Sequence, residues 1–526
     1  MLIIGHSLTS DLSALVRSGH QIPAVQYFDT EVGARWLYQD QKDFTLEHLV
    51  LRMTSMRPWR GLGKLRGADF SQLSREALQA RCAGDAEGAR RIYPRLAQEI
   101  QARGLRPLWD LAMSVLPILA EIGGTGMALN QPLLRERTRQ GDQWLEQEKA
   151  ALEEQLGIQN LRSHPQLAAR LFGPLGAEPL QRTTTGWSTN RVSLLWARHQ
   201  ARQKKHDELA GWLSRLLEYG TQEKLHTTYY RKWDGRARVH ALYSLGRTAT
   251  GRLASFAENL MNIPPQVREL IIPSSWFDYI VVGDLGQIEL RVAAHVSGDR
   301  VMQQLLNEGR DIHAITTAQV LGLPEPRTAR EITAFKKRYE RQRATGKMAN
   351  FAIIFAITSE SLRWKIFEDT DGAVLLEEEE AQSYIDAFFS VFSGYAEHMR
   401  RGWEAIQRGD PVRSLFGFEW ELPRNEEGWR RRLNYPVQSV ASWLLMLGLR
   451  ALHRRLKQER LQSRIIGTVH DNIVLEVPKQ ELRPVSRMLR EVCEHPDTRA
   501  FGFTLSVPLV MEVKSGPNWA QLEPTE

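Results

Sequence analysis

Two apolar, β-rich segments lie far apart in this chain of 526 residues, and a long helical block separates them. The segment from Tyr279 to Gly283 is typical of a buried strand, and the segment from Ile465 to Val477 has two apolar arms around a polar tip. The block between them, from about Ile312 to Gly409, is rich in Arg and Glu and has helical periodicity. This order predicts one sheet domain that is interrupted by a helical insertion.

The rest of the chain alternates in the same way. The first hundred residues mix short apolar runs, Leu2 to Ile4 and Ala24 to Phe28, with helical patterns, as an α/β unit would. Helical periodicity dominates from about Pro107 to Tyr230, and a β-rich segment follows from about Val239. One apolar stripe of the helical region contains Trp144, Leu145, Ala151, Leu152 and Leu156.

Composition excludes some classes of protein and favours others. The chain has 69 Lys and Arg against 62 Asp and Glu, and a net charge of +7 suits a nucleic-acid partner without proving one. Its two cysteines, Cys82 and Cys493, support neither a disulfide framework nor a cysteine metal site. The opening apolar run is too short for a secretory signal, and we expect no membrane span because no run of ~18 apolar residues is evident. These features predict an intracellular enzyme with about three or four domains.

The first candidate catalytic residue is Asp284, which directly follows the strand from Tyr279. The next residues, Leu285 to Arg291, begin a helix. A carboxylate at a strand end is well placed to hold a divalent cation, because such ions prefer fixed oxygen ligands. The alternative is that Asp284 only caps the helix that follows it.

A second pattern lies in the helical block, where Arg343, Lys347, Phe351 and Phe355 recur every four residues. This spacing predicts that all four lie along one gently winding face of a helix. Two cations followed by two rings suit a triphosphate and then a base, because cations neutralise phosphates and rings stack on bases. The alternative is an ordinary amphipathic helix whose long basic side chains cover apolar surface.

The second candidate carboxylate is Asp471, in the polar tip His470-Asp471-Asn472. Short polar residues between two β-rich arms indicate a hairpin, and its tip could aim Asp471 at a metal shared with Asp284. The alternative is a turn residue that makes only local hydrogen bonds.

These strings resemble the three ordered motifs of the family A, or DNA polymerase I-like, DNA polymerases. Asp284-Leu-Gly-Gln-Ile-Glu-Leu-Arg291 is similar to the first palm motif, which usually reads Asp-Tyr-Ser-Gln-Ile-Glu-Leu-Arg. The run from Arg343 through Lys347 to Asn350-Phe351 resembles the finger-helix motif, and Val469-His-Asp-Asn472 resembles the third motif, Val-His-Asp-Glu. Together with weaker matches, the resemblance extends from about Pro107 to Trp519.

The resemblance implies an α+β multidomain protein with the right-hand polymerase fold: a palm around an antiparallel sheet, helical fingers and a helical thumb. The implied domains are a truncated α/β exonuclease-like (RNase H-like) domain at 1–104, a thumb at 105–245, a palm at 246–311 and 412–526, and fingers at 312–411. The implied activity is DNA-directed DNA synthesis from a primer 3′ end, in replication or repair. The expected cofactor is a pair of Mg²⁺ ions, with Mn²⁺ as a substitute.

The resemblance also implies partners and site residues. The partners are primer-template DNA and dNTPs, and the resemblance does not identify any accessory proteins. The protein is expected to be a monomer in the cytoplasm of a bacterial cell or phage-infected host. The implied metal ligands are Asp284 and Asp471, and Lys347 joins them as a catalytic residue. The implied dNTP-binding residues are Arg343, Lys347, Phe351, Phe355, Glu289, His313 and Gln287. The implied DNA-binding residues are Arg252, Asn259, Arg430, Asn434, Gln438, His470 and Lys224. Glu289 would crowd the sugar 2′ position and exclude ribonucleotides.

Several positions depart from the usual family residues. Leu285-Gly286 stands for Tyr-Ser, Phe355-Ala356 for Tyr-Gly, Asn472 for Glu and Met261 for Gln, and aromatic residues around Phe418 replace basic ones. None of these changes removes a metal ligand. A silent primer-template binding protein is the rival hypothesis from another class, and the retained carboxylates argue against it. An RNA polymerase of the same superfamily is disfavoured by the residue at 289.

The first hundred residues resemble the later parts of a 3′–5′ proofreading exonuclease. Asp11 matches the second motif and Asp85 the third, whereas the first motif, an Asp-x-Glu on the opening strand, is missing. Asp29 follows the second motif without matching a ligand. Two metals need about four converging carboxylates, so we expect a relic that does not cleave. The alternative is that a separate polypeptide supplies the missing strand; no 5′-nuclease region is expected before it.

Overall fold

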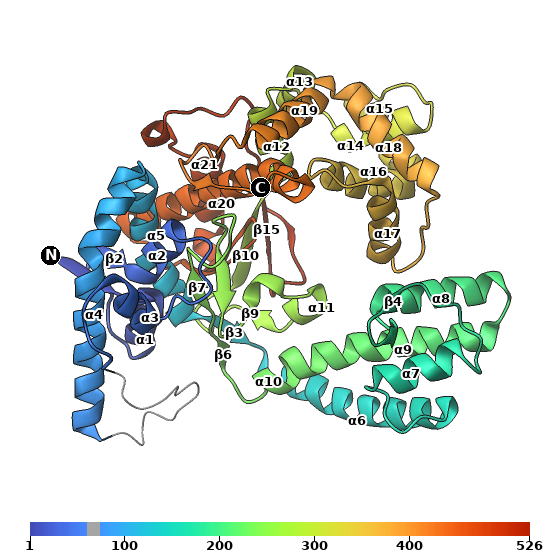
Figure 1. Cartoon of the computed structure of the whole chain (residues 1–526), viewed down its shortest axis with the longest axis horizontal. Coiled ribbons are helices and arrows are strands. Elements are labelled where there is room, and N and C mark those ends of the chain that lie inside the picture. The colour runs from blue at the N-terminus through green and yellow to red at the C-terminus, as the bar shows by residue number, and fades with distance from the viewer. Residues whose placement is uncertain (60–73, 526) are drawn as a thin grey trace. The chain divides into compact units, whose positions relative to one another are not determined.

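The structure is a computed structural model of the chain, and it describes residues 1–59 and 74–525 (Figure 1). It divides into two compact units. Unit 1 consists of Met1–Ala128, Arg238–Val296 and Met399–Glu526, and unit 2 consists of Leu129–Ala237 and Ser297–His398. Unit 1 is therefore assembled from three separate stretches of chain. The predicted interruption of a sheet domain by a helical block is confirmed.

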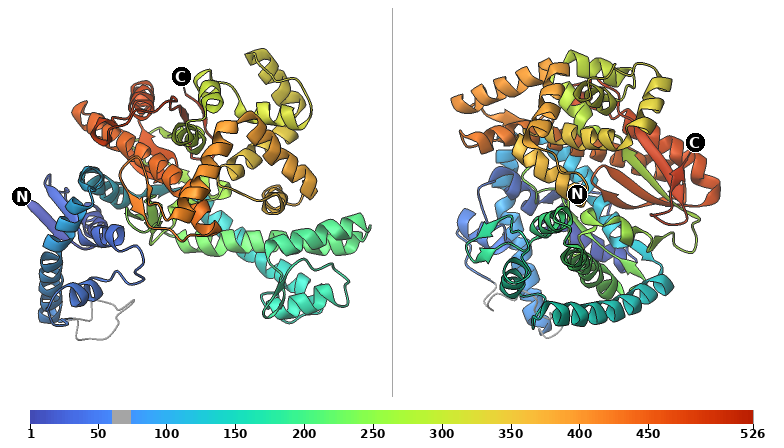
Figure 2. Two further views of the ribbon diagram at one scale, coloured as in Figure 1. Left: turned by 45° about the horizontal axis from the view of Figure 1, so that its top comes forward. Right: turned by 90° about the vertical axis from the view of Figure 1, so that its right-hand side faces the viewer.

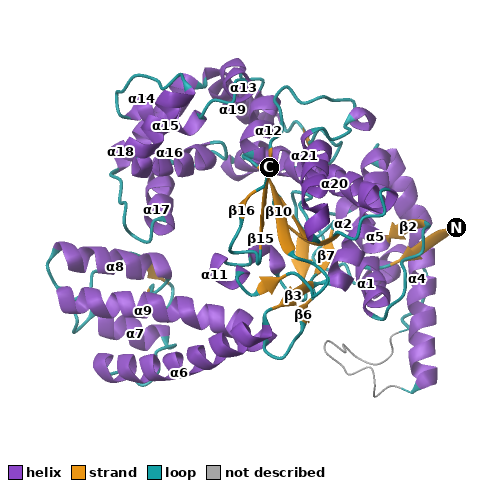
Figure 3. Ribbon diagram, turned by 180° about the vertical axis from the view of Figure 1, so that it is seen from behind, coloured by secondary structure: helices purple, strands orange, loops and turns teal. Residues whose placement is uncertain are grey.

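The main sheet of unit 1 has five strands in the order β13-β14-β10-β15-β16 (Figure 3). These are β10 (Tyr279–Leu285), β13 (Arg464–Val469), β14 (Asn472–Val477), β15 (Met511–Gly516) and β16 (Glu523–Pro524). All pairings are antiparallel, and the central strand β10 sets Val281 opposite Leu475 on one side and Ser515 on the other. The apolar run of β10 is buried, as its β-branched composition predicts.

Two long helices support this sheet. Helix α21 (Leu482–Glu494) packs against β10 and β15, and α20 (Glu426–Gln458) packs against α21. The amphipathic sequence of α21 explains its place, because Val485, Met488 and Leu489 are all buried. The helix that follows β10 is α12 (Ile288–Ser297), whose Ile288 and Val292 are buried.

The N-terminal stretch of unit 1 is an α/β arrangement. Strands β1 (Leu2–Gly5) and β2 (Gln26–Asp29) pair in parallel, and Figure 2 shows the long helix α4 (Arg75–Ala102) beside the other N-terminal elements. The remaining elements are α1 (Leu8–Arg17), α2 (Thr30–Leu37), α3 (Leu46–Met53) and α5 (Arg106–Thr125).

An aromatic cluster joins this stretch to the rest of unit 1. The ring of Trp36, on α2, makes edge contacts with Trp109, Phe418 and Trp443 at centroid distances of 5.5, 5.6 and 5.8 Å. Its indole N–H donates to the carbonyl of Leu245 at 3.1 Å. Such aromatic pairs add to the stability gained by burial. The unusual aromatic residues around Phe418 therefore serve packing here.

Helix α5 corrects one expectation from the sequence. It is long and apolar enough to cross a membrane by length and composition alone. However, 72% of that stretch is buried inside the structure, as in the core helix of a globular unit. It packs against α1, α20 and β13.

The smaller elements of unit 1 form short sheets and connections. They are β3 (Met127–Leu129), β6 (Arg238–Val239), β7 (Leu242–Ser244), β8 (Ala254–Phe256), α11 (Pro265–Arg268), β9 (Ile271–Ile272), β11 (Val412–Arg413) and β12 (Glu419–Trp420). Strands β6, β3 and β9 make one sheet, and β7-β8 and β11-β12 are antiparallel pairs.

The first half of unit 2 is helical. It contains α6 (Gln131–Leu156), α7 (His164–Phe172), β4 (Arg182–Thr183), β5 (Gly186–Trp187), α8 (Arg191–Gln203), α9 (Asp207–Leu225), a π-helical turn (His226–Tyr230) and α10 (Arg231–Trp233). Helix α6 begins at an Asn130 cap and ends at Gly157, which has a φ of 63°. Most of the predicted apolar stripe is confirmed, because Leu152 and Leu156 are fully buried in the core of this half and Trp144 and Leu145 pack against it, whereas Ala151 is not part of this core.

The second half of unit 2 is also helical. It contains α13 (Arg300–Asn307), α14 (Ile312–Val320), α15 (Ala329–Arg338), α16 (Glu340–Ile353), α17 (Ser359–Asp369) and α18 (Glu378–Val391), and α19 (Ser393–Arg408) follows. Helix α15 starts with a capping box formed by Thr328 and Glu331. Asp311 caps α14 by accepting a hydrogen bond from the Ala314 amide at 3.0 Å.

Candidate active site

The two predicted metal ligands come together at one end of the main sheet. Asp284 lies near the end of β10, opposite Asn472 of β14. Val469 pairs with Asn472, so His470 and Asp471 form a two-residue hairpin tip, as predicted, with His470 at a φ of 52°. The amide of Leu285 donates to the carbonyl of Asp471 at 3.1 Å, which ties the hairpin tip to the strand end.

The two carboxylates influence each other electrostatically. The pKa of Asp471 is raised to about 6. Burial is the main cause, the negative charge of Asp284 also raises the pKa, and the Arg252 guanidinium opposes both. A carboxyl in this setting resists ionisation because its charge is poorly solvated and meets a second negative charge. A bound cation would relieve both costs.

This donor set fits divalent cations. Hard ions such as Mg²⁺ are often held by one or two carboxylates, with water and substrate phosphates as the other ligands. Within residues 1–59 and 74–525, no group of three or more His, Cys, Asp or Glu side chains converges on a metal position.

Two arginines flank the carboxylate pair. Arg252 forms an ion pair with Glu289 on α12, and the charge of Asp471 also acts on it. Arg268 lies at the end of α11, and the charge of Asp284 acts to raise its pKa. Its guanidinium lies 5.3 Å from the Trp519 ring centroid. Burial lowers the pKa of both guanidinium groups. Arg268 lies outside the sequence motifs described above, so the sequence did not predict its place beside the carboxylate pair.

A second cluster, in unit 2, surrounds the predicted phosphate-binding cations. Arg343 on α16 donates through Nε and Nη2 to Oδ2 of Asp311, at 2.9 and 2.7 Å. Lys336 Nζ lies 3.0 Å from the same oxygen. Burial alone would raise the pKa of Asp311, but the hydrogen bonds from Lys336 and Arg343 outweigh it, and the pKa falls below its ordinary value. Asp311 thus holds Arg343 in place and lowers its effective charge.

His313 lies in the same cluster and is fully buried. Its Nδ1 is 3.0 Å from Nδ2 of Asn350, and because an amide nitrogen can only donate, Nδ1 is the acceptor. The pKa of His313 is lowered to about 4, mainly by burial; the charge of Asp311 opposes this and the nearby cations add to it. The imidazole is therefore neutral at pH 7 and carries its proton on Nε2, which has no hydrogen-bond partner among the described residues.

The prediction that Arg343, Lys347, Phe351 and Phe355 share one helix face is wrong for the last of these residues. Phe351 lies on α16 with its ring 5.6 Å from His313 and 6.0 Å from Lys347 Nζ. Phe355, however, lies beyond the helix, which ends at Ile353. Ala356 adopts a φ of 58°, a left-handed conformation that turns the chain away, so the helical spacing does not extend to Phe355.

The other predicted contact residues are distributed over both units. In unit 1, Asn259 is exposed and accepts from Ser255, and Arg430 pairs with Glu426 on its own helix. Asn434 and Gln438 are half-buried on α20, and the Asn434 Oδ1 is buried with no partner among the described residues. Gln287 directly precedes α12 with a φ of 56°. In unit 2, Lys224 is exposed in the last turn of α9.

The exonuclease-like residues lie in the N-terminal stretch of unit 1. Partial burial and the charge of Asp85 raise the pKa of Asp11, so the two carboxyls are near each other. Asp85 accepts a hydrogen bond from the Trp59 indole at 2.8 Å. Asp29 instead caps α2 and accepts from the amides of Ser7 and Leu8 at 3.0 and 2.7 Å. Its carboxylate is thus committed to holding backbone groups.

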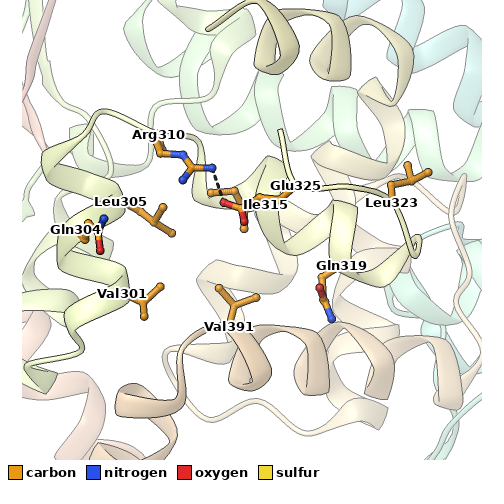
Figure 4. A pocket seen from close by; sticks show the side chains of 9 residues that line it. All are labelled: Val301, Gln304, Leu305, Arg310, Ile315, Gln319, Leu323, Glu325 and Val391. Carbon is orange, nitrogen blue, oxygen red and sulfur yellow. Dashed lines mark hydrogen bonds and ion pairs between the residues drawn. The ribbon is translucent and has the colours of Figure 1, made fainter. Parts of the chain in front are cut away.

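Each unit also has a pocket that lies away from these clusters. In unit 2, a pocket of about 230 Å³ lies among α13, α14 and the end of α18 (Figure 4). Its apolar lining includes Leu305 and Ile315, and the ion pair of Arg310 with Glu325 stands beside it. In unit 1, a cavity of about 540 Å³ lies beside Trp36. Neither hollow is lined by a residue that the sequence predicted for substrate binding.

Comparison with known sequences now identifies the class. A profile of DNA polymerase family A matches residues 131–521, which is well over half of the chain, and the chain belongs to this family. DNA polymerase I of Chloroflexus aurantiacus is 28% identical over 549 residues, covering 99% of this chain and 55% of that protein. DNA polymerase I of Pseudomonas aeruginosa is 29% identical, covering 86% of this chain and 48% of its own length. The chain spans about half the length of these relatives.

A solved structure has the same fold. The POL domain of Pol1 from M. smegmatis, in complex with DNA primer-template and dNTP, superposes with a TM-score of 0.80 at 22% identity. The match covers 98% of this chain and 85% of that one. The predicted α+β polymerase fold is therefore confirmed.

Proposed function

We propose that this protein is a DNA-directed DNA polymerase that adds dNTPs to a primer 3′ end. The observation that carries the proposal is the Asp284–Asp471 pair, which a strand end and a hairpin tip bring together within unit 1. Family membership supports it, and primer-template DNA and dNTPs are the proposed partners. We propose that the protein acts as a monomer in the cytoplasm of a bacterial cell or phage-infected host.

The carboxylate pair would hold two divalent ions, Mg²⁺ or Mn²⁺. When bound, such ions activate the primer 3′ hydroxyl and neutralise the leaving pyrophosphate. The work of the protein is then to hold Asp284 and Asp471 rigidly. The backbone hydrogen bond from Leu285 to Asp471 does this, because it fixes the hairpin tip against β10.

The α16 cluster would bind the incoming nucleotide. Lys347 is exposed and would neutralise the triphosphate, while Arg343 would exchange its bond to Asp311 for a phosphate oxygen. His313, as a neutral imidazole, would donate a hydrogen bond from Nε2 to a phosphate oxygen of the nucleotide. Phe351 would stack on the base and sugar.

Glu289 would select deoxyribonucleotides by crowding the sugar 2′ position. Its ion pair with Arg252 supports this role, because the arginine fixes the direction of the carboxylate. The DNA would be held by the residues predicted for it: Arg252, Asn259, Arg430, Asn434, Gln438, His470 and Lys224.

The N-terminal stretch would serve as a brace without proofreading activity. Asp29 is committed to backbone groups, which leaves Asp11 and Asp85 as the two matched carboxylates. The packing of Trp36 supports the role of a brace. We assign 1–104 to this part, 105–245 to the thumb, 246–311 and 412–526 to the palm, and 312–411 to the fingers.

Primer extension tests the proposal. Wild type should extend a labelled primer with dNTPs and Mg²⁺, and much less with NTPs. Asp284→Asn and Asp471→Asn should lower the rate by roughly 10³-fold or more while DNA binding, measured by fluorescence anisotropy, persists. The matched control is Asp278→Asn, just before β10, whose Oδ2 accepts from the Lys479 amide at 2.7 Å and which should leave extension unchanged.

Two results would contradict the proposal. Undiminished extension by either carboxylate variant would remove the metal assignment. Tight primer-template binding by wild type without any extension would instead support the rival hypothesis, a silent DNA-binding protein.

A further inference from the structure

The pocket of about 230 Å³ in the second half of unit 2 has an apolar surface to which three helices contribute (Figure 4). On α13, Val301 and Leu305 are four residues apart and therefore lie on one face of the helix. Ile315 comes from α14 and Val391 from the end of α18. Leu305 and Ile315 are almost fully buried, whereas Val301 is 43% exposed. An apolar ligand would cover this valine and be favoured by its burial.

Hydrogen bonds at the helix ends fix the shape of this pocket. The buried carboxylate of Asp299 caps α13 and also accepts from the amide of Tyr395 at 2.8 Å, in the first turn of α19, which directly follows α18. At the other end of α13, Gly309 has a φ of 67°, and the amide of Arg310 donates to the carbonyl of Leu305 at 2.9 Å. This is the pattern of a Schellman motif, and it brings Arg310 back beside the last turn of α13.

Arg310 gives the pocket a cation with unused hydrogen-bonding capacity. Its side chain is only 17% exposed. Nη2 donates to the carboxylate of Glu325 and to the carbonyl of Pro326, the latter at 3.2 Å. Nε is buried and has no hydrogen-bond partner among the described residues. Because a buried N–H without an acceptor is costly, a ligand that supplies an acceptor here gains more than an ordinary surface contact would give.

The guanidinium and the apolar surface together define the chemistry of a ligand. A carboxylate can accept from Nε and Nη2 of one guanidinium at the same time, and such charge-assisted bonds are about twice as strong as neutral ones. The volume limits the rest of the molecule, since an apolar cavity of about 150 Å³ holds benzene. About 230 Å³ therefore suits a carboxylic acid with one ring or one branched chain.

We propose that this pocket is a binding site for a small monocarboxylate with an apolar body. The carboxylate of the ligand replaces Glu325 at Nη2 of Arg310 and also accepts from Nε, while the body packs on Val301, Ile315 and Val391. Glu325 is free to leave, because it is 38% exposed and lies in the irregular segment between α14 and α15. The site uses none of the residues proposed for binding dNTPs or DNA.

Ligand-observed NMR tests the site with three acids of this kind: benzoate, phenylacetate and 4-methylpentanoate. We expect wild type to bind at least one of them with a Kd of about 1 mM or below. The corresponding amide, which has the same shape without the charge, should bind about tenfold more weakly. Glu325→Gln should tighten binding of the acid about threefold, because it removes the competing carboxylate. Damage to the fold cannot produce such a gain.

Two variants that should lose binding locate the ligand. Arg310→Gln removes the guanidinium and should weaken binding of the acid about tenfold. Val391→Phe reduces the space in the pocket while it keeps Arg310 and Glu325, and it should weaken binding to a similar extent. The matched control is Arg300→Gln, at the start of α13, which changes an arginine that does not line the pocket and should bind as wild type does.

Several results would overturn this proposal. Wild type that binds none of the three acids has no such site. Binding that Arg310→Gln and Val391→Phe leave unchanged would place the acids elsewhere on the protein. Equal affinity for acid and amide, or no gain in Glu325→Gln, would remove the role of Arg310. None of these measurements depends on polymerase activity, so primer extension by wild type decides the proposed function separately.

Discussion

Replacing Asp471 by asparagine should destroy polymerase activity and yet make the metal-free protein more stable at neutral pH. The reason is the cost of holding an ionised Asp471 beside Asp284 in a poorly solvated position. Asparagine keeps nearly the same shape and removes the charge. The stability gained should therefore measure the repulsion that a cation normally relieves.

The size of the effect follows from the pKa. Asp471 moves from an ordinary value of 3.8 to about 6 in the folded protein, a difference of about 2 units at ~1.4 kcal/mol each. A raised folded-state pKa contributes stability below pH 3.8, and this stability is lost as the pH rises through 6. Asp471→Asn should thus match wild type near pH 4 and exceed it by about 2–3 kcal/mol at pH 7.5. In a unit of about 300 residues this corresponds to a rise of about 4 °C in Tm.

Thermal unfolding in EDTA, at half-unit steps between pH 4 and 8, measures the difference. Adding Mg²⁺ at pH 7.5 should then raise the Tm of wild type and leave that of Asp471→Asn nearly unchanged, because the variant has lost a ligand. Asp278→Asn, at the other end of β10, serves as the control and should follow wild type under both conditions.

Two results would refute this reasoning. If Asp471→Asn and wild type have parallel Tm curves across this pH range, the two carboxylates do not repel each other in the folded protein. If Mg²⁺ stabilises both proteins equally, the pair does not hold the cation.

Ala356→Gly should stabilise unit 2 by about 1 kcal/mol in thermal unfolding, because alanine is strained at a φ of 58°, and a lower Tm would argue against this turn. Phe351→Tyr should increase dideoxynucleotide incorporation severalfold in a terminator assay, since a tyrosine hydroxyl can replace the contact of the missing 3′ hydroxyl; equal use would count against its placement at the sugar. His313, with a pKa of about 4, should make wild type lose as much as about 3 kcal/mol of stability as the pH falls from 6.5 to 4, and His313→Gln should flatten that part of the curve; parallel curves would contradict the buried neutral imidazole. The isolated protein should leave a 3′-mismatched primer intact with Mg²⁺ or Mn²⁺ and no dNTPs, whereas shortening that Asp11→Ala abolishes would reveal a working nuclease.

Local patterns in the sequence predicted the elements that carry the candidate site. The apolar run from Tyr279 became β10, the arms around Asp471 became a hairpin with a two-residue tip, and the basic segment from Arg343 became α16. Each of these has a period or a turn signal that a short window contains.

Ion pairs between residues that are far apart in the sequence could not be predicted from such local patterns. Nothing in the window around Arg252 indicates an ion pair with Glu289, and nothing near Arg343 indicates that Asp311 will hold it. The end of α16 was missed for a related reason. A glycine at 356 would have signalled a left-handed turn, but alanine usually continues a helix, so Phe355 was wrongly placed on its face.

The position of β10 in its sheet has a consequence for how the protein is made. Its partners are β14 and β15, so Val281 cannot pair with Leu475 and Ser515 until these residues have been synthesised, much later than β10. The first half of unit 2 precedes β10, and every buried member of its core except Phe367 comes from its own residues, so most of this core can form early. The strand that carries Asp284 instead emerges with both edges unpaired, a state prone to aggregation and slow to resolve. A nascent chain should therefore acquire its carboxylate pair only when synthesis is nearly complete, and chaperones that shield strand edges should raise its yield.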